Sequence, residues 1–166
     1  MRRELEEQIC NACPNLFRGE AFSFEHGDGW FELMFHLSSL IEKEVVKIKR
    51  KAFILFPLRY IKHFFGWIKY NREMPGDKMT WSEYKHVYLE DAMSLPTPVQ
   101  IKEKFSSLRY YMSWENGAIS ALIAEAEEIS GETCENCGKP GRIRGKGWVY
   151  CRCDECWENL NKPRPA

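Results

Sequence analysis

Residues 134–156, CENCGKPGRIRGKGWVYCRCDEC, decide how the C-terminal region of this chain folds. They contain two C-x2-C pairs separated by fifteen residues, a spacing that is typical of a four-cysteine zinc site. Two thiolates from each of two tight turns close a tetrahedron around one Zn²⁺, and four protein ligands leave no open position for water. The sequence therefore predicts a structural zinc ion whose ligands are Cys134, Cys137, Cys153 and Cys156.

The segment between the two pairs predicts a short hairpin that joins two zinc knuckles. Gly145 and Gly147 lie between Ile143 and the apolar run 148–150, where they can form its turn. Cys151 is an alternative ligand, but with Cys153 it would form a tighter C-x-C chelate, so we interpret it as spare. The alternative to zinc is a set of buried reduced cysteines or disulfides. The spacing, the glycines and a charged start that does not resemble a signal peptide favour zinc.

Size and charge set limits on the class of protein. The chain has 166 residues, which is about the length of one domain. Hydrophobic residues make up 44% of it, enough to form a buried core. It has no long apolar stretch, so no transmembrane helix is predicted, and its charged start, which does not resemble a signal peptide, predicts a cytoplasmic location with reduced thiols. The net charge is zero, which disfavours a dedicated nucleic-acid binder.

The zero charge is a sum of blocks of opposite sign. Residues 41–72 hold nine Lys/Arg against two Glu, and residues 138–152 hold five Lys/Arg and no acid. Between them, residues 114–135 hold six Glu and no Lys or Arg. Such blocks either meet within the fold or present a charged face to a partner.

Apolar periodicity predicts helices over residues 2–13, 30–50, 81–93 and from Asn116-Gly117 to just before Gly131. We expect Asp28 to cap the helix at 30–50, and Thr80 to cap the helix at 81–93 in a capping box with Glu83. Pro57 is expected to interrupt the following stretch, with a helix restarting there and running to about residue 70.

Strand signals are confined to one segment outside the zinc lobe. Residues 99–112 alternate between apolar and polar side chains and predict a β-hairpin that turns at Ser106-Ser107, whereas residues 16–28 are predicted to form a loop. The predicted fold class is α+β, mostly helical, with a β-hairpin and a small C-terminal lobe of the zinc-ribbon or zinc-knuckle type.

Three stretches of the sequence are similar to a family of small zinc-binding proteins encoded by bacteriophages and prophages. They are CPNLFR at 13–18 with EHGDGW at 25–30, VQIKEKFSSLRYY at 99–111, and TCENCG at 133–138 with GW at 147–148 and CDEC at 153–156. Family members tend to have glycine where Ser106 and Ser107 stand. The resemblance implies a phage origin and a zinc-bearing fold but supplies no enzymatic activity or mechanism.

The resemblance also divides the chain. The segment at about 45–95 has no counterpart in the family and is expected to be a helical insertion in an α+β domain that covers residues 1–131. The zinc lobe is expected at 132–160, followed by a tail at 161–166.

Residues 25–30, EHGDGW, form the first candidate site. His26 and Asp28 in a glycine-rich turn could carry out acid–base chemistry, or together with Trp30 they could contact a ligand or partner. The alternative is a structural turn in which Asp28 caps a helix and Trp30 anchors it. We favour the structural turn, followed by ligand contact.

Cationic side chains of the predicted hairpin form the second candidate site. Lys102 and Lys104 project from one face of a strand, and Arg109 can join them from the opposing strand, beside Tyr110 and Tyr111. Cations next to aromatic rings suit a phosphate with a stacked base. The alternative is a solvated face that pairs with the acidic helix at 115–128.

Residues 47–70 form a basic stretch rich in aromatic residues. Its apolar residues are too dense for a fully exposed segment, so it is expected to pack against the core or against a second copy of the chain at residues 45–70. Contact with another partner or with a membrane surface is the alternative.

The leading functional hypothesis is a non-enzymatic, phage-encoded binding protein for counter-defence or host takeover. It would sequester an anionic nucleotide or block a host protein, through the ligand-binding candidates His26, Asp28, Trp30, Lys102, Lys104, Arg109 and Tyr111. The alternative is nucleic-acid binding by the basic zinc hairpin, through Arg142, Arg144, Lys146 and Arg152. An enzyme that uses His26 and Asp28 ranks third, because the sequence has no nucleophile motif or phosphate loop.

Overall fold

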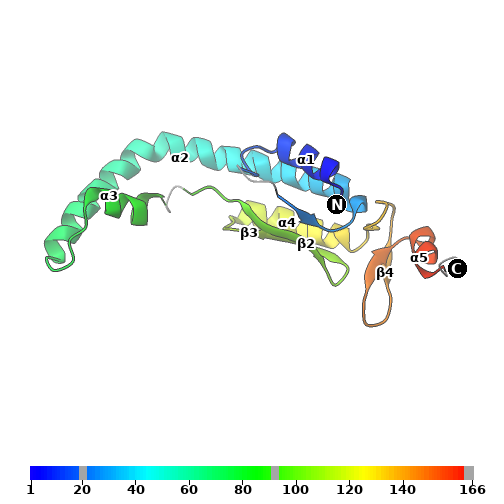
Figure 1. Cartoon of the computed structure of the whole chain (residues 1–166). Helices are drawn as coiled ribbons and strands as arrows, with labels where there is room; N and C mark the ends of the chain where they lie inside the picture. The colour runs from blue at the N-terminus through cyan, green and yellow to red at the C-terminus, as the bar shows by residue number, and fades with distance from the viewer. Residues whose placement is uncertain (19–21, 91–93, 163–166) are drawn as a thin grey trace. The chain divides into compact units, whose positions relative to one another are not determined.

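The computed structural model describes residues 1–18, 22–90 and 94–162, and the chain divides into two compact units, Met1–Val45 with Pro96–Ala166, and Val46–Leu95. The first unit contains the helices α1 (Arg3–Ala12), the start of α2 (Phe31–Glu73), α4 (Gly117–Ser130) and α5 (Asp154–Asn161), and the 3₁₀ turn η1 (Asp28–Trp30) (Figure 1). Its strands are β1 (Phe24–Glu25), β2 (Pro98–Lys104), β3 (Ser107–Met112), β4 (Arg142–Arg144) and β5 (Tyr150–Arg152). The second unit contains the rest of α2, then α3 (Trp81–Tyr84) and the π-helical segment η2 (Lys85–Glu90). The α+β class, mostly helical with a hairpin and a C-terminal cysteine cluster, is therefore confirmed.

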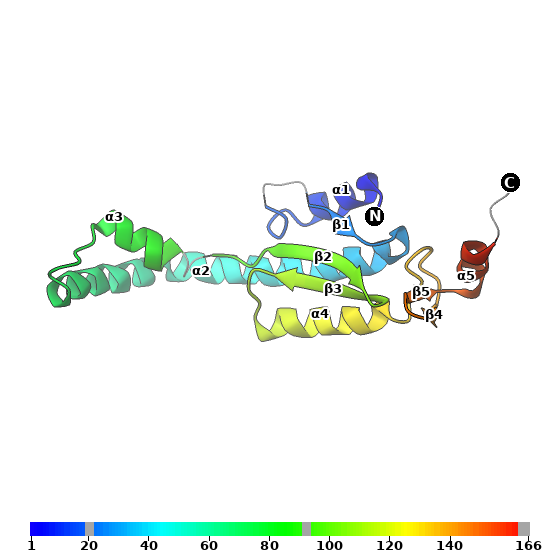
Figure 2. The same ribbon diagram turned by 60° about the horizontal axis from the view of Figure 1, so that its bottom comes forward.

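The first unit is built on a three-stranded sheet in the order β1-β2-β3 (Figure 2). The predicted hairpin is confirmed, since β2 and β3 pair antiparallel with Lys102 opposite Arg109. Strand β1 pairs parallel with β2, with Phe24 opposite Ile101. It lies in a segment that was predicted to be a loop, and that prediction was wrong here because two residues are too few to show an alternating pattern.

One face of the sheet is buried under helices. Ile101 and Leu108 are fully buried, and Leu108 donates its backbone N–H to Oγ of Ser130 on α4 at 2.8 Å. Burial raises the pKa of Tyr110 on the same face, and the Ser38 side chain on α2 partly offsets that rise. Because strand side chains alternate, Lys102 and Arg109 start from the opposite face of the sheet. The guanidinium of Arg109 nevertheless reaches Glu127 of α4 at 3.3 Å.

A carboxylate of α2 anchors the segment that follows α1. Glu42 accepts the backbone N–H groups of Asn15 at 3.2 Å and Leu16 at 2.8 Å. Leu16 is fully buried, so this segment forms part of the core. The motif CPNLFR at 13–18 therefore acts as a packed connection between α1 and the sheet.

The turn between β2 and β3 differs from the predicted one. Strand β3 begins at Ser107, and the two residues at the turn are Phe105, with φ of 55°, and Ser106, with φ of 62°. Both lie in the left-handed region that disfavours residues with a side chain, above all bulky ones. Glu103 accepts the Ser106 N–H and so stabilises the turn. The prediction of a turn at Ser106-Ser107 was therefore wrong by one residue.

In the second unit, α2 continues through Pro57, so the predicted interruption was wrong. A proline inside a helix removes one hydrogen bond and costs about 3 kcal/mol. The helix persists because the following turns pack against the next helix: the rings of Phe64 and Trp67 lie 5.5 Å and 5.8 Å from that of Trp81 on α3. Trp67 also donates its indole N–H to the Met79 carbonyl oxygen.

The predicted capping box is confirmed, because Thr80 and Glu83 exchange both hydrogen bonds at the start of α3. The helix predicted at 81–93 is α-helical only to Tyr84 and then π-helical to Glu90, and its last residues, 91–93, lie outside the described residues. The second unit, Val46–Leu95, nearly coincides with the insertion predicted at about 45–95. That this unit is an insertion stays a prediction. No helix among the described residues combines the length and apolar character needed to cross a bilayer.

Candidate metal centre

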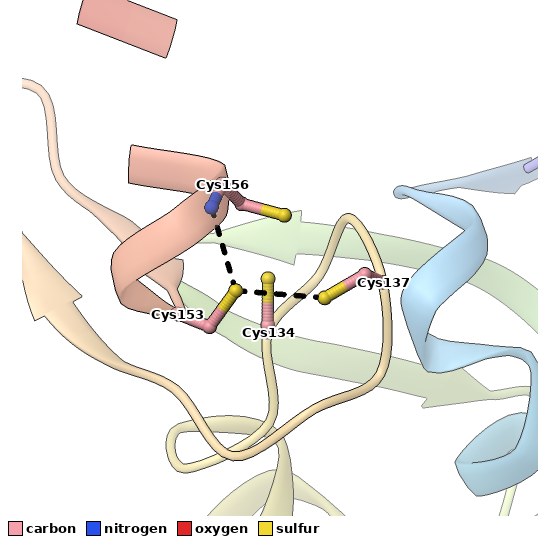
Figure 3. Close-up of side chains that lie close together, drawn as sticks. All are labelled: Cys134, Cys137, Cys153 and Cys156. Carbon is pink, nitrogen blue, oxygen red and sulfur yellow. Dashed lines mark hydrogen bonds between the residues drawn. The ribbon is translucent and has the colours of Figure 1, made fainter. Parts of the chain in front are cut away.

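The four predicted ligand cysteines converge on one point in the C-terminal lobe. The sulfur atoms of Cys134, Cys137, Cys153 and Cys156 all lie within 4.8 Å of one another (Figure 3). The Sγ atoms of Cys137 and Cys153 are 3.6 Å apart, and a tetrahedron with Zn–S bonds of about 2.3 Å has edges of about 3.8 Å. The cluster can therefore hold a metal ion, and a set of four thiolates fits Zn²⁺ rather than a hard cation such as Mg²⁺.

The first cysteine pair lies in a tight knuckle. Gly138 has a φ of 76° and donates its N–H to the Cys134 carbonyl oxygen at 2.8 Å. Burial alone would raise the pKa of Cys134, but hydrogen bonds from the backbone N–H groups of Cys153, Asn136 and Cys137 lower it to about 6. Backbone groups of both cysteine pairs thus favour a thiolate at Cys134, which is the form that binds a metal.

The second pair lies at the start of a helix. Cys153 is the N-cap of α5, and its sulfur accepts the backbone N–H of Cys156. Asp154 and Glu155 occupy the first helical turn, where acidic side chains interact favourably with the helix dipole. The predicted hairpin between the two cysteine pairs is confirmed, since β4 and β5 pair antiparallel. The structure adds that the second pair also begins a helix, α5.

Cys151 lies outside the cluster. It is fully buried and donates its thiol to the Gly131 carbonyl oxygen at 3.1 Å. Burial raises its pKa to about 11. This geometry agrees with the interpretation of Cys151 as spare.

The Gly27–Trp30 turn lies directly against the cysteine cluster of the C-terminal lobe. Gly29 donates its N–H to the Glu135 carbonyl oxygen at 2.8 Å, and the Trp30 indole donates to the Thr133 carbonyl oxygen at 2.8 Å. The Gly27 N–H donates to the Glu135 carboxylate at 2.9 Å. Two motifs that lie far apart in the sequence therefore form one joint between the sheet domain and the cysteine cluster.

This joint accounts for the first group of candidate site residues. We expected Asp28 to cap α2, and this was wrong: its carboxylate accepts the backbone N–H and the side chain of Arg2. Asp28 is instead the first residue of η1, whose N-cap is Gly27. Those hydrogen bonds lower the pKa of Asp28. Trp30 is fully buried.

His26 is also buried, between the rings of Phe24 and Trp30. Burial lowers its pKa to about 4, and Nδ1 lies 2.9 Å from the Gly27 carbonyl oxygen. Its Nε2 atom has no hydrogen-bond partner among the described residues. The three residues His26, Asp28 and Trp30 thus each have a structural role, and ligand binding by them stays a prediction.

The second group of candidates lies on the open face of the sheet. The ammonium of Lys102 is 5.7 Å from the centre of the Tyr111 ring, and the ammonium of Lys104 is 5.4 Å from that of Phe105. Arg109, opposite Lys102, pairs with Glu127 of α4 at 3.3 Å. The structure therefore brings Lys102 and Tyr111 together on one face, whereas the guanidinium of Arg109 is directed to α4, where Glu127 neutralises part of its charge.

Two aromatic residues that the sequence reasoning did not select lie at the hairpin tips. Phe105 at the β2–β3 turn is 73% exposed, and Trp148 in the β4–β5 loop is 74% exposed. With Glu103, Lys104, Gly147 and Val149 they line a cavity of about 210 Å³, which we call the hairpin-tip cavity. The available signal was an aromatic residue beside a turn residue: Phe105 directly precedes the predicted turn at Ser106-Ser107, and Trp148 directly follows Gly147.

Comparison with protein-family models, curated proteins and solved structures finds no match for this chain. The similarity to phage-encoded zinc-binding proteins therefore stays a prediction that rests on the three motifs.

Proposed function

We propose that this chain is a non-enzymatic binding protein that is organised by a structural Zn²⁺ and holds an anionic nucleotide at its hairpin tips. The observation that carries this proposal is the hairpin-tip cavity, where Phe105 and Trp148 are both about three quarters exposed. Exposed aromatic rings are costly in water and provide stacking surfaces for a base. At about 210 Å³ the cavity is smaller than most small-molecule pockets, so it would admit one ring while the phosphates stay outside.

Backbone strain supports a role for Phe105 in binding. A bulky residue in the left-handed region costs on the order of 1–3 kcal/mol, and such strain clusters at functional sites. Glycine at this turn would remove the cost. Phe105 adopts a φ of 55° and presents its ring to solvent, so the turn retains an aromatic side chain against its own conformational preference.

Charge next to the cavity supports an anionic ligand. Lys104 lines the cavity, and Lys102 lies two residues earlier on the same face of β2. Neither lysine has an ion-pair partner in the described part of the chain. Phosphate groups that extend from a stacked base would meet these ammonium groups first.

The same geometry weighs against nucleic-acid binding by the zinc hairpin. Arg142 and Arg144 both pair with Asp154, and Arg152 pairs with Glu135 at 3.4 Å. A nucleic-acid backbone would have to displace these carboxylates before it could use the arginines. The blocking of a host protein would use the same exposed rings as anchors. Phage origin, counter-defence and action in the host cytoplasm stay predictions from the resemblance.

Calorimetric titration of the zinc-loaded full chain with mono-, di- and cyclic nucleotides tests the proposal. We expect at least one to bind, and Trp148→Ala to weaken it about tenfold or more, since stacking on one ring is worth about 1–3 kcal/mol. Trp114→Ala is the control, because Trp114 is another partly exposed tryptophan of the same unit and does not line the cavity. No binding by any nucleotide would exclude the ligand and leave a protein partner for this surface.

A further inference from the structure

The second unit carries an apolar stripe that its own helices do not cover. It consists of side chains on α2 that are between 45% and 72% exposed: Ile54, Leu58, Ile61, Phe65 and Ile68. Their spacing of four, three, four and three residues places them on one side of the helix. Tyr60, Phe64 and Trp67 on another side of α2 contact Trp81 of α3. The stripe is thus a second apolar face, separate from the one that α3 covers.

The residues around the stripe are strongly cationic. Residues 46–72 contain eight Lys/Arg and no Asp or Glu. Lys51, Lys62 and Lys69 recur at intervals of eleven and seven residues, which places them in one row on the helix. Lys62 and Lys69 each follow a stripe residue directly, so this row runs along one flank of the stripe.

These charges argue against a second copy of the chain as the occupant. The heptad-like spacing would suit a pair of helices, but two copies would bring Lys62 and Lys69 of each helix near the lysines of the other. Residues 46–72 hold no acidic side chain. Glu73 at the end of α2 pairs with Lys69 at 3.9 Å, which leaves Lys51 and Lys62 to repel the lysines of a second copy, and like charges along such a seam are destabilising. Pro57 also lies beside the stripe, next to Leu58, where helix pairs need close backbone packing.

We propose that this face of α2 binds the surface of an anionic membrane. The helix would lie in the plane of the interface, with the stripe in the boundary between headgroups and acyl chains. Lys51, Lys62 and Lys69 would extend their stems outward and place their ammonium groups at the lipid phosphates. The choice of a lipid surface rests on charge complementarity, because the eight cations of residues 46–72 match an anionic leaflet and repel a second copy, although one of them, Lys69, also pairs with Glu73 at 3.9 Å. This inference is independent of nucleotide binding.

Co-sedimentation of the full chain with vesicles tests the proposal. Vesicles of phosphatidylcholine with phosphatidylserine are compared with phosphatidylcholine alone, at low and physiological salt. We expect binding to the anionic vesicles only, falling as salt rises. Ile54→Ser should weaken it about tenfold, whereas Ile129→Ser, the same substitution at an exposed isoleucine of α4, should not. Lys62→Glu should weaken it at least fivefold, and Lys78→Glu, with the same change in charge, should have less effect.

Circular dichroism of each variant separates loss of binding from loss of folding. Sedimentation equilibrium without lipid identifies a competing occupant. A dimer that Ile54→Ser dissociates would overturn the proposal, since a second copy would then cover the stripe. Absence of binding to anionic vesicles at low salt, or equal loss in Ile54→Ser and Ile129→Ser, would overturn it as well.

Discussion

Gly29 and Cys134 meet backbone to backbone: a Cβ atom added to Gly29 would lie 2.3 Å from the carbonyl oxygen of Cys134. The same atom would lie 2.5 Å from the Cys137 N atom. Real Cβ contacts do not come this close, so only glycine fits. The tight turn of the sheet domain and the first cysteine pair therefore fix each other's positions.

Gly29→Ala should separate these two parts. Because both neighbours are backbone atoms of a knuckle, neither can move without displacing Cys134 or Cys137. We expect a loss of about 1–3 kcal/mol or more in the free energy of unfolding, together with weaker metal retention against a chelator. Urea unfolding measures the loss of stability, and competition with a zinc indicator measures the loss of metal affinity.

Gly117→Ala is the matched control, because nothing lies within 4 Å of its added Cβ. Gly117 is also the first residue of α4, where alanine is the better helix former. Equal stability of the two variants would contradict the close contact at Gly29.

Ser130→Ala should destabilise the contact between α4 and the sheet. The substitution leaves the buried Leu108 N–H without its acceptor, and an unsatisfied buried donor costs about 1–3 kcal/mol. Denaturant unfolding measures this. Ser120→Ala on the same helix should cost less than about 1 kcal/mol, because Ser120 is only half-buried and its hydroxyl donates to the carbonyl oxygen of Asn116, the N-cap residue of that helix. A Ser130→Ala loss no greater than that of Ser120→Ala would count against the assigned hydrogen bond.

His26 should make folding stability depend on pH. Its pKa is lowered to about 4 in the folded chain against 6.5 in the unfolded chain, chiefly by burial. The unfolded state therefore binds more protons between these values, so stability is full above pH 6.5 and is lost as the pH falls towards 4. The loss amounts to about 3 kcal/mol at most.

The variant His26→Phe keeps a ring between Phe24 and Trp30 but cannot titrate. Between pH 7 and pH 4 the free energy of unfolding of this variant should fall by less than that of the wild type. The difference between the two falls is the contribution of His26, about 3 kcal/mol at most. The same substitution at the exposed His36 is the control. If His26→Phe and the wild type showed parallel pH profiles, His26 would not be the buried neutral group described above.

The features that sequence could predict are those with a local physical cause. The cysteine spacing identified the four thiols that converge, because two ligands three residues apart can always reach one ion. The Thr80 capping box depends only on residues three apart. The alternation in β2 and β3 placed Ile101 inside and Lys102 outside, since the period of a strand is two.

The features that escaped prediction depend on distant segments. Gly27 and Glu135 are 108 residues apart in the chain, and nothing local marks a glycine that another backbone approaches. Asp28 had the sequence of an N-cap, but its carboxylate binds Arg2, the N-cap residue of α1, which lies 26 residues away in the chain. Pro57 stayed within a helix because aromatic packing against α3 outweighed its local cost.

X-ray absorption at the zinc edge of the purified full chain tests the central claim most directly. The account predicts one zinc ion with four sulfur ligands at about 2.3 Å, in the wild type and equally in Cys151→Ala, whose thiol faces the Gly131 carbonyl oxygen. Cys156→Ser should lose one sulfur ligand. A nitrogen or oxygen ligand in the wild type, or the loss of a sulfur ligand in Cys151→Ala, would contradict a closed centre formed by Cys134, Cys137, Cys153 and Cys156.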